Sequence, residues 1–264
     1  MGDKWSDFAT STRTEINELL SKSVVDRQQA EDFLNTVIDR SKGQIESHVL
    51  ETLLMCNPFF IEYPVEELNK GFKRVYRTKG HPKAKGIDIQ IEYPMSWSIK
   101  KGNRPNVIKF LMANKGKGPA SFSLMVKDIF AEAGSDEFRS ELSQIETING
   151  ANEIALEMFS DESLVQMARG MGAQNVRSIK TKRIVLDRWP GAMIEFIGEQ
   201  QRVDLKITSY YQSYMCLYKN YMIFLQCGVF KWPWDKGDDF QKRIDRYKPI
   251  FRKIAYNFII QSQY

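Results

Sequence analysis

Residues 87–99 read Ile87-Asp-Ile-Gln-Ile-Glu-Tyr-Pro-Met-Ser-Trp-Ser-Ile99, and this stretch decides the fold. Its three isoleucines alternate with polar residues, which is the period of two of a half-buried strand. Pro94 cannot donate a hydrogen bond to a neighbouring strand, so the strand is expected to end there. Trp97 is large enough to fill the layer that covers a sheet. The stretch therefore predicts the first strand of an antiparallel sheet in an α+β protein.

More strands are predicted after this stretch, separated by short polar turns. A Pro-Gly turn is expected at Arg188–Gly191 and a two-residue hairpin loop at Lys219-Asn220. The first three strands, ending near residue 129, are predicted to be antiparallel neighbours because short loops join them. The predicted strands after Ile99 span residues 107–113, 121–129, 176–187, 192–197, 203–218 and 221–230.

The hairpin at Lys219-Asn220 sets the spacing of two cysteines. It places Cys216 opposite Ile223 and Gln212 opposite Cys227, so the two cysteines share a face about 13 Å apart, beyond disulfide reach. The chain has 3 cysteines, the third being Cys56, so at least one thiol is unpaired. Buried, reduced cysteines are expected.

Helices are predicted at both ends of the chain. Near the start, spaced apolar residues indicate helices over 5–22 and 26–55. Pro64 suits a first helical position, followed by an apolar face of Leu68, Phe72, Val75 and Tyr76. Ser160 is expected to cap a crossover helix that ends at Gly170-Met-Gly172. The last helix, over 238–259, is predicted to kink or divide at Pro249.

Charge is distributed unevenly along the chain. Residues 1–70 contain 7 Lys and Arg against 13 Asp and Glu, and the remaining residues contain 31 against 20. Opposite net charges favour contact between the two parts. The predicted organisation is a helical N-terminal region at 1–77, an exposed basic linker at 78–86 and a sheet domain at 87–264. The apolar stripes of the helical region must pack on each other, on the sheet domain or on a second copy of the chain.

The sheet domain resembles the Mog1/PsbP-like family, which includes DcrB-type bacterial proteins. The resemblance covers about residues 86–264 and rests on Tyr93-Pro-Met-Ser-Trp97, Val126-Lys-Asp128, the segment 184–196 (Ile-Val-Leu-Asp-Arg-Trp-Pro-Gly-Ala-Met-Ile-Glu-Phe) and the stripe that ends at 251–258. It implies an α/β/α sandwich, used in that family for protein association: photosystem II stabilisation, binding of a small GTPase, chaperoning of secreted effectors or envelope roles. It supplies no functional residues, and residues 1–77 have no counterpart in the family's shared core.

No catalytic or metal-binding pattern appears in the sequence. His48 and His81 have no second histidine or cysteine at a metal-ligand spacing. There is no Gly-x-Ser-x-Gly, and Gly170-Met-Gly172 lacks the Lys-Ser/Thr of a phosphate loop. We therefore expect a protein that is not an enzyme and has no cofactor and no metal.

Two groups of residues are candidates for binding a partner. Trp232 and Trp234 bracket a proline, so they either form an exposed platform or fold back onto the edge of the sheet. Lys100, Lys101 and Arg104 lie in a predicted loop and could bind nucleic acid or anionic lipid. A solvated surface or one that binds an acidic protein partner is favoured instead, because stacking aromatics are not interleaved with these cations. Other cations on loops and strand ends are Lys115, Lys117, Lys180, Lys182 and Arg183.

Nearby carboxylates have two interpretations. Asp235, Asp238 and Asp239 either cap the last helix or bind a cation, and capping is favoured because an aspartate at a helix start needs no further partner.

The sequence thus predicts a non-catalytic factor for protein binding, assembly or chaperoning. The alternative is a binder of a small or lipidic ligand between the helical region and the sheet. The 42% apolar and 27% charged composition is that of a soluble globular protein, and no apolar run approaches the ~20 residues of a membrane span. Met1–Ser6 resembles no secretory signal, and both a periplasmic and a cytoplasmic location stay open. Homo-oligomerisation would occur through the N-terminal helices.

Overall fold

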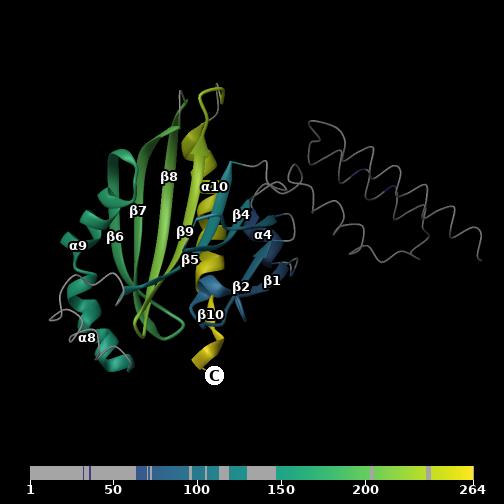
Figure 1. Cartoon of the computed structure of the whole chain (residues 1–264). Helices are drawn as coiled ribbons and strands as arrows, with labels where there is room; N and C mark the ends of the chain where they lie inside the picture. Colours follow the sequence, from purple (N-terminus) through teal and green to yellow (C-terminus); the bar gives the residue numbers. More distant parts are fainter. Residues whose placement is uncertain are drawn as a thin grey trace, which may run out of the picture. The chain divides into compact units, whose positions relative to one another are not determined.

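The computed structural model describes residues 64–69, 73–94, 97–104, 106–112, 119–129, 147–202, 205–235 and 239–263, with residues 32, 36 and 71 (Figure 1). Contacts divide the chain into two units. The first comprises Met1–Lys73 with Pro94–Ser96, and the second comprises Arg74–Tyr93 with Trp97–Tyr264. The helices predicted over 5–22 and 26–55 lie outside the described residues, apart from residues 32 and 36.

In the first unit the described helix is α4, Pro64–Asn69. It begins at Pro64 as predicted, with Glu66 and Glu67 in its first turn, where carboxylates face the positive end of the helix dipole. The prediction that the helix continues to Tyr76 is wrong. Residues Lys73–Arg77 form strand β1 instead, in which Val75 is exposed.

A three-stranded sheet has the order β1-β2-β10, with β2 at Ile89–Pro94 and β10 at Ile259–Ile260. Ile89 and Ile91 are fully buried, which confirms the alternation that predicted a strand here. The prediction that this strand pairs with the ones that follow needs correction. Its antiparallel partner β10 comes from the other end of the chain, in register Ile259↔Gln90. The 3-10 helix η3, Gln261–Gln263, follows β10.

The segment 78–86 is not the exposed linker that its composition predicts. Thr78 and Ala84 are buried, and residues Pro82–Ala84 form the 3-10 helix η1. Thr78 Oγ1 donates to the Ile87 carbonyl and accepts from the Ile89 N–H, each at 2.7 Å. These bonds fix the segment against β2, so the exposed-chain interpretation is wrong. Whether the segment joins two domains stays a prediction.

The main sheet has seven antiparallel strands in the order β3-β4-β5-β9-β8-β7-β6. Three antiparallel neighbours were predicted up to residue 129, and this holds for β3, β4 and β5, where β3 is the part of the opening stretch near Ile99 and β2 belongs to the other sheet. The α+β fold class with an antiparallel sheet flanked by helices is likewise confirmed. The strands span Ser98–Lys101 (β3), Val107–Met112 (β4), Ala120–Asp128 (β5), Gln174–Leu186 (β6), Trp189–Arg202 (β7), Leu205–Tyr218 (β8) and Tyr221–Lys231 (β9).

Two hairpin turns test the turn predictions. The loop Lys219-Asn220 is confirmed, with Tyr218↔Tyr221 and Gln212↔Cys227 in register. The turn predicted at Arg188–Gly191 is wrong by one to three residues. The β6–β7 turn is Asp187-Arg188, both with positive φ, and Leu186 pairs with Trp189. Two positive φ values are the requirement of a type I′ turn, which matches the twist of the strands.

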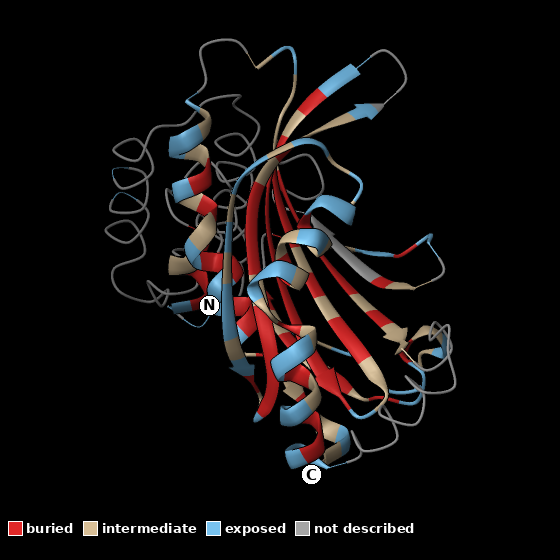
Figure 2. Ribbon diagram, turned by 90° about the vertical axis from the view of Figure 1, so that its left-hand side faces the viewer, coloured by how far each residue is buried: buried red, intermediate tan, exposed pale blue. Residues whose placement is uncertain are grey.

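Helices lie on both faces of the main sheet. Helices α8 (Ile148–Met158) and α9 (Asp161–Gly170) contact β6, β7 and β8, and α10 (Phe240–Tyr256) contacts β8 and β9 on the opposite face. Ser160 caps α9 as predicted. Figure 2 shows buried residues concentrated along the central strands, with the outer sides of the helices exposed.

The core joins α10 to the sheet and to the segment after β2. Trp97 is 2% exposed and meets Phe251 edge to face at 6.4 Å, so Trp97 fills the core as predicted. The helix was predicted to kink or divide at Pro249; it does not divide, since α10 runs through Pro249 as one element, and a kink there stays a prediction. Cys216 and Cys227 are buried free thiols, as predicted, whereas Cys56 lies outside the described residues.

Candidate functional site

The two tryptophans that the sequence singled out lie on a turn after β9. Trp232 and Trp234 stack with their rings 5.1 Å apart and 9° from parallel. Trp234 is 61% exposed, so the stacked pair is largely open to solvent on the Trp234 side. A large exposed aromatic ring is a common anchor in protein interfaces.

Asp235 locks this turn onto α10. Its Oδ2 accepts from the Trp232 N–H at 3.0 Å and from Arg243 Nη1 at 2.8 Å, and Arg243 Nη1 also donates to the Phe230 carbonyl at 2.6 Å. Burial alone would raise the pKa of Asp235, but the bonds from Arg243 and Trp232 outweigh it and hold the pKa below the ordinary value of 3.8. Asp239 caps α10 as predicted, and Asp238 lies outside the described residues.

A groove opens on the face of the main sheet that also carries α8 and α9. We call it the basic groove; its volume is about 390 Å³. The end of β3 and the loop after it bring the exposed cations Lys100, Lys101 and Arg104 to its rim. The prediction that Lys100 and Lys101 lie in a loop is wrong, because they are the last two residues of β3 and pair with β4. The other lining residues are Gly102, Asn103, Val107, Ser121, Ser123, Met125, Met171, Gln200, Tyr211, Gln226, Gly228 and Phe230.

The rim of the groove is held from below by Lys83 of η1. Lys83 Nζ donates to the carbonyl oxygens of Gly102 at 2.6 Å, Arg104 at 2.7 Å and Val107 at 3.2 Å. A Cβ on Gly102 would collide with the Val107 carbonyl, so the loop closes only with glycine there. The basic rim is therefore a braced loop.

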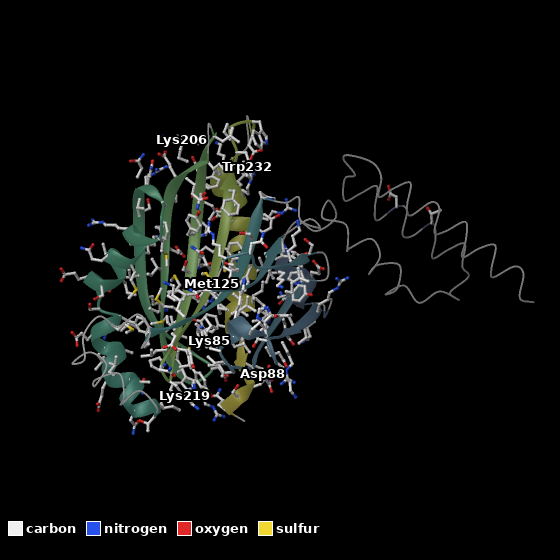
Figure 3. All side chains as sticks on the ribbon, in the orientation of Figure 1. Lys85, Asp88, Met125, Lys206, Lys219 and Trp232 are labelled. Atoms are coloured by element: carbon white, nitrogen blue, oxygen red, sulfur yellow. The ribbon has the colours of Figure 1, made fainter. Side chains whose placement is uncertain are left out.

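The structure brings only part of the predicted set together. Lys100, Lys101 and Arg104 share the groove, whereas neither Trp232 nor Trp234 lines it. Figure 3 shows Met125 near the middle of the sheet and Trp232 at the end where β8 begins. The other predicted cations lie elsewhere. Arg183 donates to the carbonyls of Phe159 and Leu156, Lys180 lies opposite Glu195, Lys182 lies on the other face, and Lys115 and Lys117 are outside the described residues.

A second cavity lies on the opposite face, between α10 and strands β6, β7 and β8. We call it the helix cleft; its volume is about 520 Å³. Glu195 is 5% exposed, and Lys248 Nζ lies 2.9 Å from its Oε1 and 2.7 Å from its Oε2. Gln212 Nε2 donates to Glu195 Oε2 at 3.1 Å. The lining residues are Lys182, Ile184, Met193, Glu195, Gln212, Tyr214, Asp245, Lys248, Pro249, Arg252 and Tyr256.

Sequence reasoning missed the helix cleft, although one signal was present. Glu195 stands in the apolar strand segment 192–197, and a carboxylate buried in a sheet needs a cationic partner. The partner Lys248 is 53 residues away, and only the packing of α10 brings it close. Burial, together with the charge of Glu195, raises the pKa of the nearby Tyr210 hydroxyl. Burial likewise raises the pKa of Tyr214, which therefore stays protonated at neutral pH.

Metal ligands are not gathered in the part of the chain that the structure describes. No group of three or more His, Cys, Asp or Glu side chains there could hold an ion. His81 caps η1, its Nδ1 accepting from the Lys83 N–H at 3.2 Å, and His48 lies outside the described residues. Among the described helices, none is both long and apolar enough to span a membrane.

The chain was compared with known families, curated proteins and solved structures. No family model matches it, and no curated protein matches it. A crystal structure from Bacteroides thetaiotaomicron is similar with a TM-score of 0.32 at 9% identity; the match covers 66% of this chain and 45% of that one, so this chain spans less than half of that protein.

Two other solved structures are matched over nearly their whole length. A Pseudomonas aeruginosa protein of unknown function, PA94, described as a putative regulator, has a TM-score of 0.31 at 12% identity, covering 70% of this chain and 95% of that one. LpqN of Mycobacterium tuberculosis, involved in cell envelope biogenesis, has a TM-score of 0.37 at 8% identity, covering 74% of this chain and 95% of that one.

Proposed function

We propose that the chain is a non-catalytic protein-binding, assembly or chaperone-like factor, built on a Mog1/PsbP-like α/β/α sandwich. The observation that carries the proposal is the basic groove, where three exposed cations stand over a floor that includes Met125, Met171 and Tyr211. Methionine and aromatic side chains adapt to varied apolar surfaces, and lysine and arginine at a rim select acidic partners. The proposed occupant is an acidic protein segment with apolar side chains.

The brace from Lys83 supports this proposal. A loop fixed by three hydrogen bonds loses little conformational freedom when a partner binds, so less of the interaction energy is spent on ordering it. The stacked pair Trp232 and Trp234 is a second candidate contact, outside the groove.

A photo-crosslinking experiment tests the proposal. A benzophenone amino acid replaces Asn103, an exposed residue of the groove, and a matched probe replaces Lys253, an exposed residue of α10 outside it. We expect the Asn103 probe to capture a specific acidic protein in the native cell extract and the Lys253 probe to capture none at comparable yield.

Charge reversal then tests the rim. The triple variant Lys100→Glu, Lys101→Glu, Arg104→Glu should weaken partner binding at least about tenfold and remove most of its salt dependence. The control reverses an equal number of exposed cations elsewhere: Lys79, Lys242 and Lys253. Equal effects of the two triples, or turnover of a small substrate by the purified protein, would contradict the proposal.

The alternative function is a binder of a small or lipidic ligand between the helical region and the sheet. It stays a prediction, since most of the helical region lies outside the described residues. Native mass spectrometry of freshly purified protein discriminates the two, because a retained small ligand would favour the alternative.

A further inference from the structure

The helix cleft has no part in the proposed protein binding and lies on the other face of the sheet from the basic groove. Its volume, about 520 Å³, is in the range of sites for small organic molecules. Buried side chains of β7 and β8 form its floor, namely Glu195, Gln212 and Tyr214. Cross-strand register sets Glu195 directly opposite Gln212.

The floor holds a hydrogen-bond acceptor that none of the described residues satisfies. Gln212 is 3% exposed and its Nε2 donates to Glu195, but its Oε1 accepts no hydrogen bond from the described residues. Buried side-chain oxygens are nearly always paired, because leaving one without a donor costs stability. A hydroxyl or amine of a ligand would supply the missing donor.

The rim of the helix cleft carries two cations that are not in ion pairs with described residues. Lys248 is matched with Glu195 through both carboxylate oxygens, and Asp245 accepts from Gln241 Nε2 at 2.9 Å. Lys182 and Arg252 are exposed and form no ion pair with the described residues. The Arg252 guanidinium lies over the Tyr256 ring at 5.7 Å, an arrangement that leaves its charge available to an anion.

The walls between rim and floor suit a carbon skeleton. Ile184, Met193 and Pro249 are apolar, and the rings of Tyr214 and Tyr256 meet edge to face at 6.3 Å. A ligand that spans the cleft thus meets a cationic rim, apolar walls and a neutral acceptor at the floor.

We propose that the helix cleft binds a small hydroxylated organic anion. Its carboxylate or phosphate pairs with Lys182 and Arg252, and one of its hydroxyl groups donates to Gln212 Oε1. The two anionic groups share the same recognition chemistry, so one probe of each kind is used in the test.

The test is a titration of the full chain labelled with 13C at the methionine methyl groups. Gluconate and glucose 6-phosphate are the probes, hexanoate is the anion without hydroxyls, and sorbitol is the polyol without charge. Met193 reports the cleft, and Met125 and Met171 report the basic groove. We expect at least one probe to shift the Met193 signal alone and to bind at least tenfold more tightly than hexanoate or sorbitol.

Two variants and a matched control assign the contacts. Gln212→Met removes the acceptor and Arg252→Gln removes a rim cation. Each variant should lower the affinity for the probe at least tenfold. Lys253→Gln changes the next residue of α10, which does not line the cleft, and should leave binding unchanged. If Gln212→Met lowers the melting temperature, the exposed Arg252→Gln variant carries the test.

Three results would overturn the proposal. The first is an unchanged Met193 signal with both probes at about 10 mM, which would largely fill a site with a Kd of about 1 mM. The second is equal binding of hexanoate, and the third is equal weakening by Lys253→Gln and Arg252→Gln.

Discussion

Gly191 shows how a single position can be fixed by the strand beside it. It pairs with Cys216 of β8, and a Cβ at this position would collide with the Met215 carbonyl oxygen. The close approach of the two backbones explains why glycine stands at position 191. A side chain here would have to push two central strands apart.

We therefore predict that Gly191→Ala lowers the free energy of unfolding by about 1–3 kcal/mol, the usual cost of overpacking a core. Urea denaturation measures it. Gly170→Ala is the control, because nothing lies within 4 Å of a Cβ there and alanine favours the helix. Equal stabilities of the two variants would contradict this account of Gly191.

Asp235 gives a prediction for acid pH. Its pKa in the folded protein is below 3.8, so its bonds to Trp232 and Arg243 contribute stability above about pH 4, and that contribution is lost as pH falls through the folded pKa. We expect tryptophan fluorescence to change in this acid range as the Trp232-Trp234 turn loosens.

The control for this pH prediction is Asp235→Asn, which has no carboxylate to titrate. Its fluorescence at neutral pH should already resemble that of the acid form of the natural protein. An unaltered acid transition in Asp235→Asn would assign the change to another group.

Turns show why residue-level prediction succeeds at one place and fails at another. Lys219-Asn220 was predicted because two apolar strands flank it closely, which leaves one register. At the β6–β7 turn the Pro190-Gly191 pair predicted a turn at the wrong place, because both residues lie inside β7. The turn itself consists of Asp187 and Arg188, both with positive φ. Nothing in that composition marks an arginine for such a conformation.

At the scale of elements, the β3–β4 loop depends on a lysine distant in sequence. Lys83 fills three carbonyl acceptors of residues 102–107, and a lysine ammonium has three N–H donors to give. From the sequence, Lys83 was predicted to be one of the cations of an exposed linker. Its actual role follows from the packing of η1 against the sheet.

Lys83→Met should therefore loosen the loop while keeping the fold. We predict faster amide hydrogen exchange at residues 102–107 and a loss of about 1–3 kcal/mol in unfolding free energy, since three carbonyls, two of them half-buried, lose a charged donor. The control Lys79→Met alters an exposed lysine of the same segment. Unchanged exchange at 102–107 would refute the bracing role.

Elements were predictable where the pattern is local. Strands β4, β5, β8 and β9 and helix α9 follow from alternation, a capping serine and a tight loop. Helix α8 was missed, because its buried side consists mainly of small residues (Gly150, Ala151 and Ala155) while Leu156 is 61% exposed. The pairing of β2 with β10 was out of reach, since it joins residues about 170 positions apart.

At the scale of the whole molecule, the two described cysteines report on global unfolding. Cys216 and Cys227 are at most 1% exposed, and burial raises the pKa of both thiols. Thiolate is the reactive form, so labelling requires the sheet to open.

In a Cys56→Ser variant we predict that these thiols react with a disulfide reagent more slowly than a free thiol by a factor on the order of 10³ or more. The rate should rise with urea in parallel with the unfolding equilibrium. Fast labelling that is independent of urea would show local opening of β8 and β9 instead.

The candidate sites were predictable where their residues are close together in the sequence, and not where distant elements form the site. Lys100, Lys101 and Arg104 share the basic groove, because the end of β3 and the loop that follows it are contiguous in the chain. The Trp pair was recognised, although the sequence did not decide between an exposed and a folded-back arrangement. The helix cleft was not predicted, because it requires both the register of β7 with β8 and the seating of α10.

Strand β8 contributes adjacent residues to the two cavities: Tyr211 lines the basic groove and Gln212 lines the helix cleft. Side chains of a strand alternate between faces, so odd positions here belong to one cavity and even positions to the other. Substitutions can therefore diversify either cavity while leaving the other intact. A deletion or insertion of one residue within 205–218 would exchange both linings at once. Amino-acid substitutions in β8 can thus change what either cavity binds, whereas a change in the number of residues in this strand would alter both cavities together.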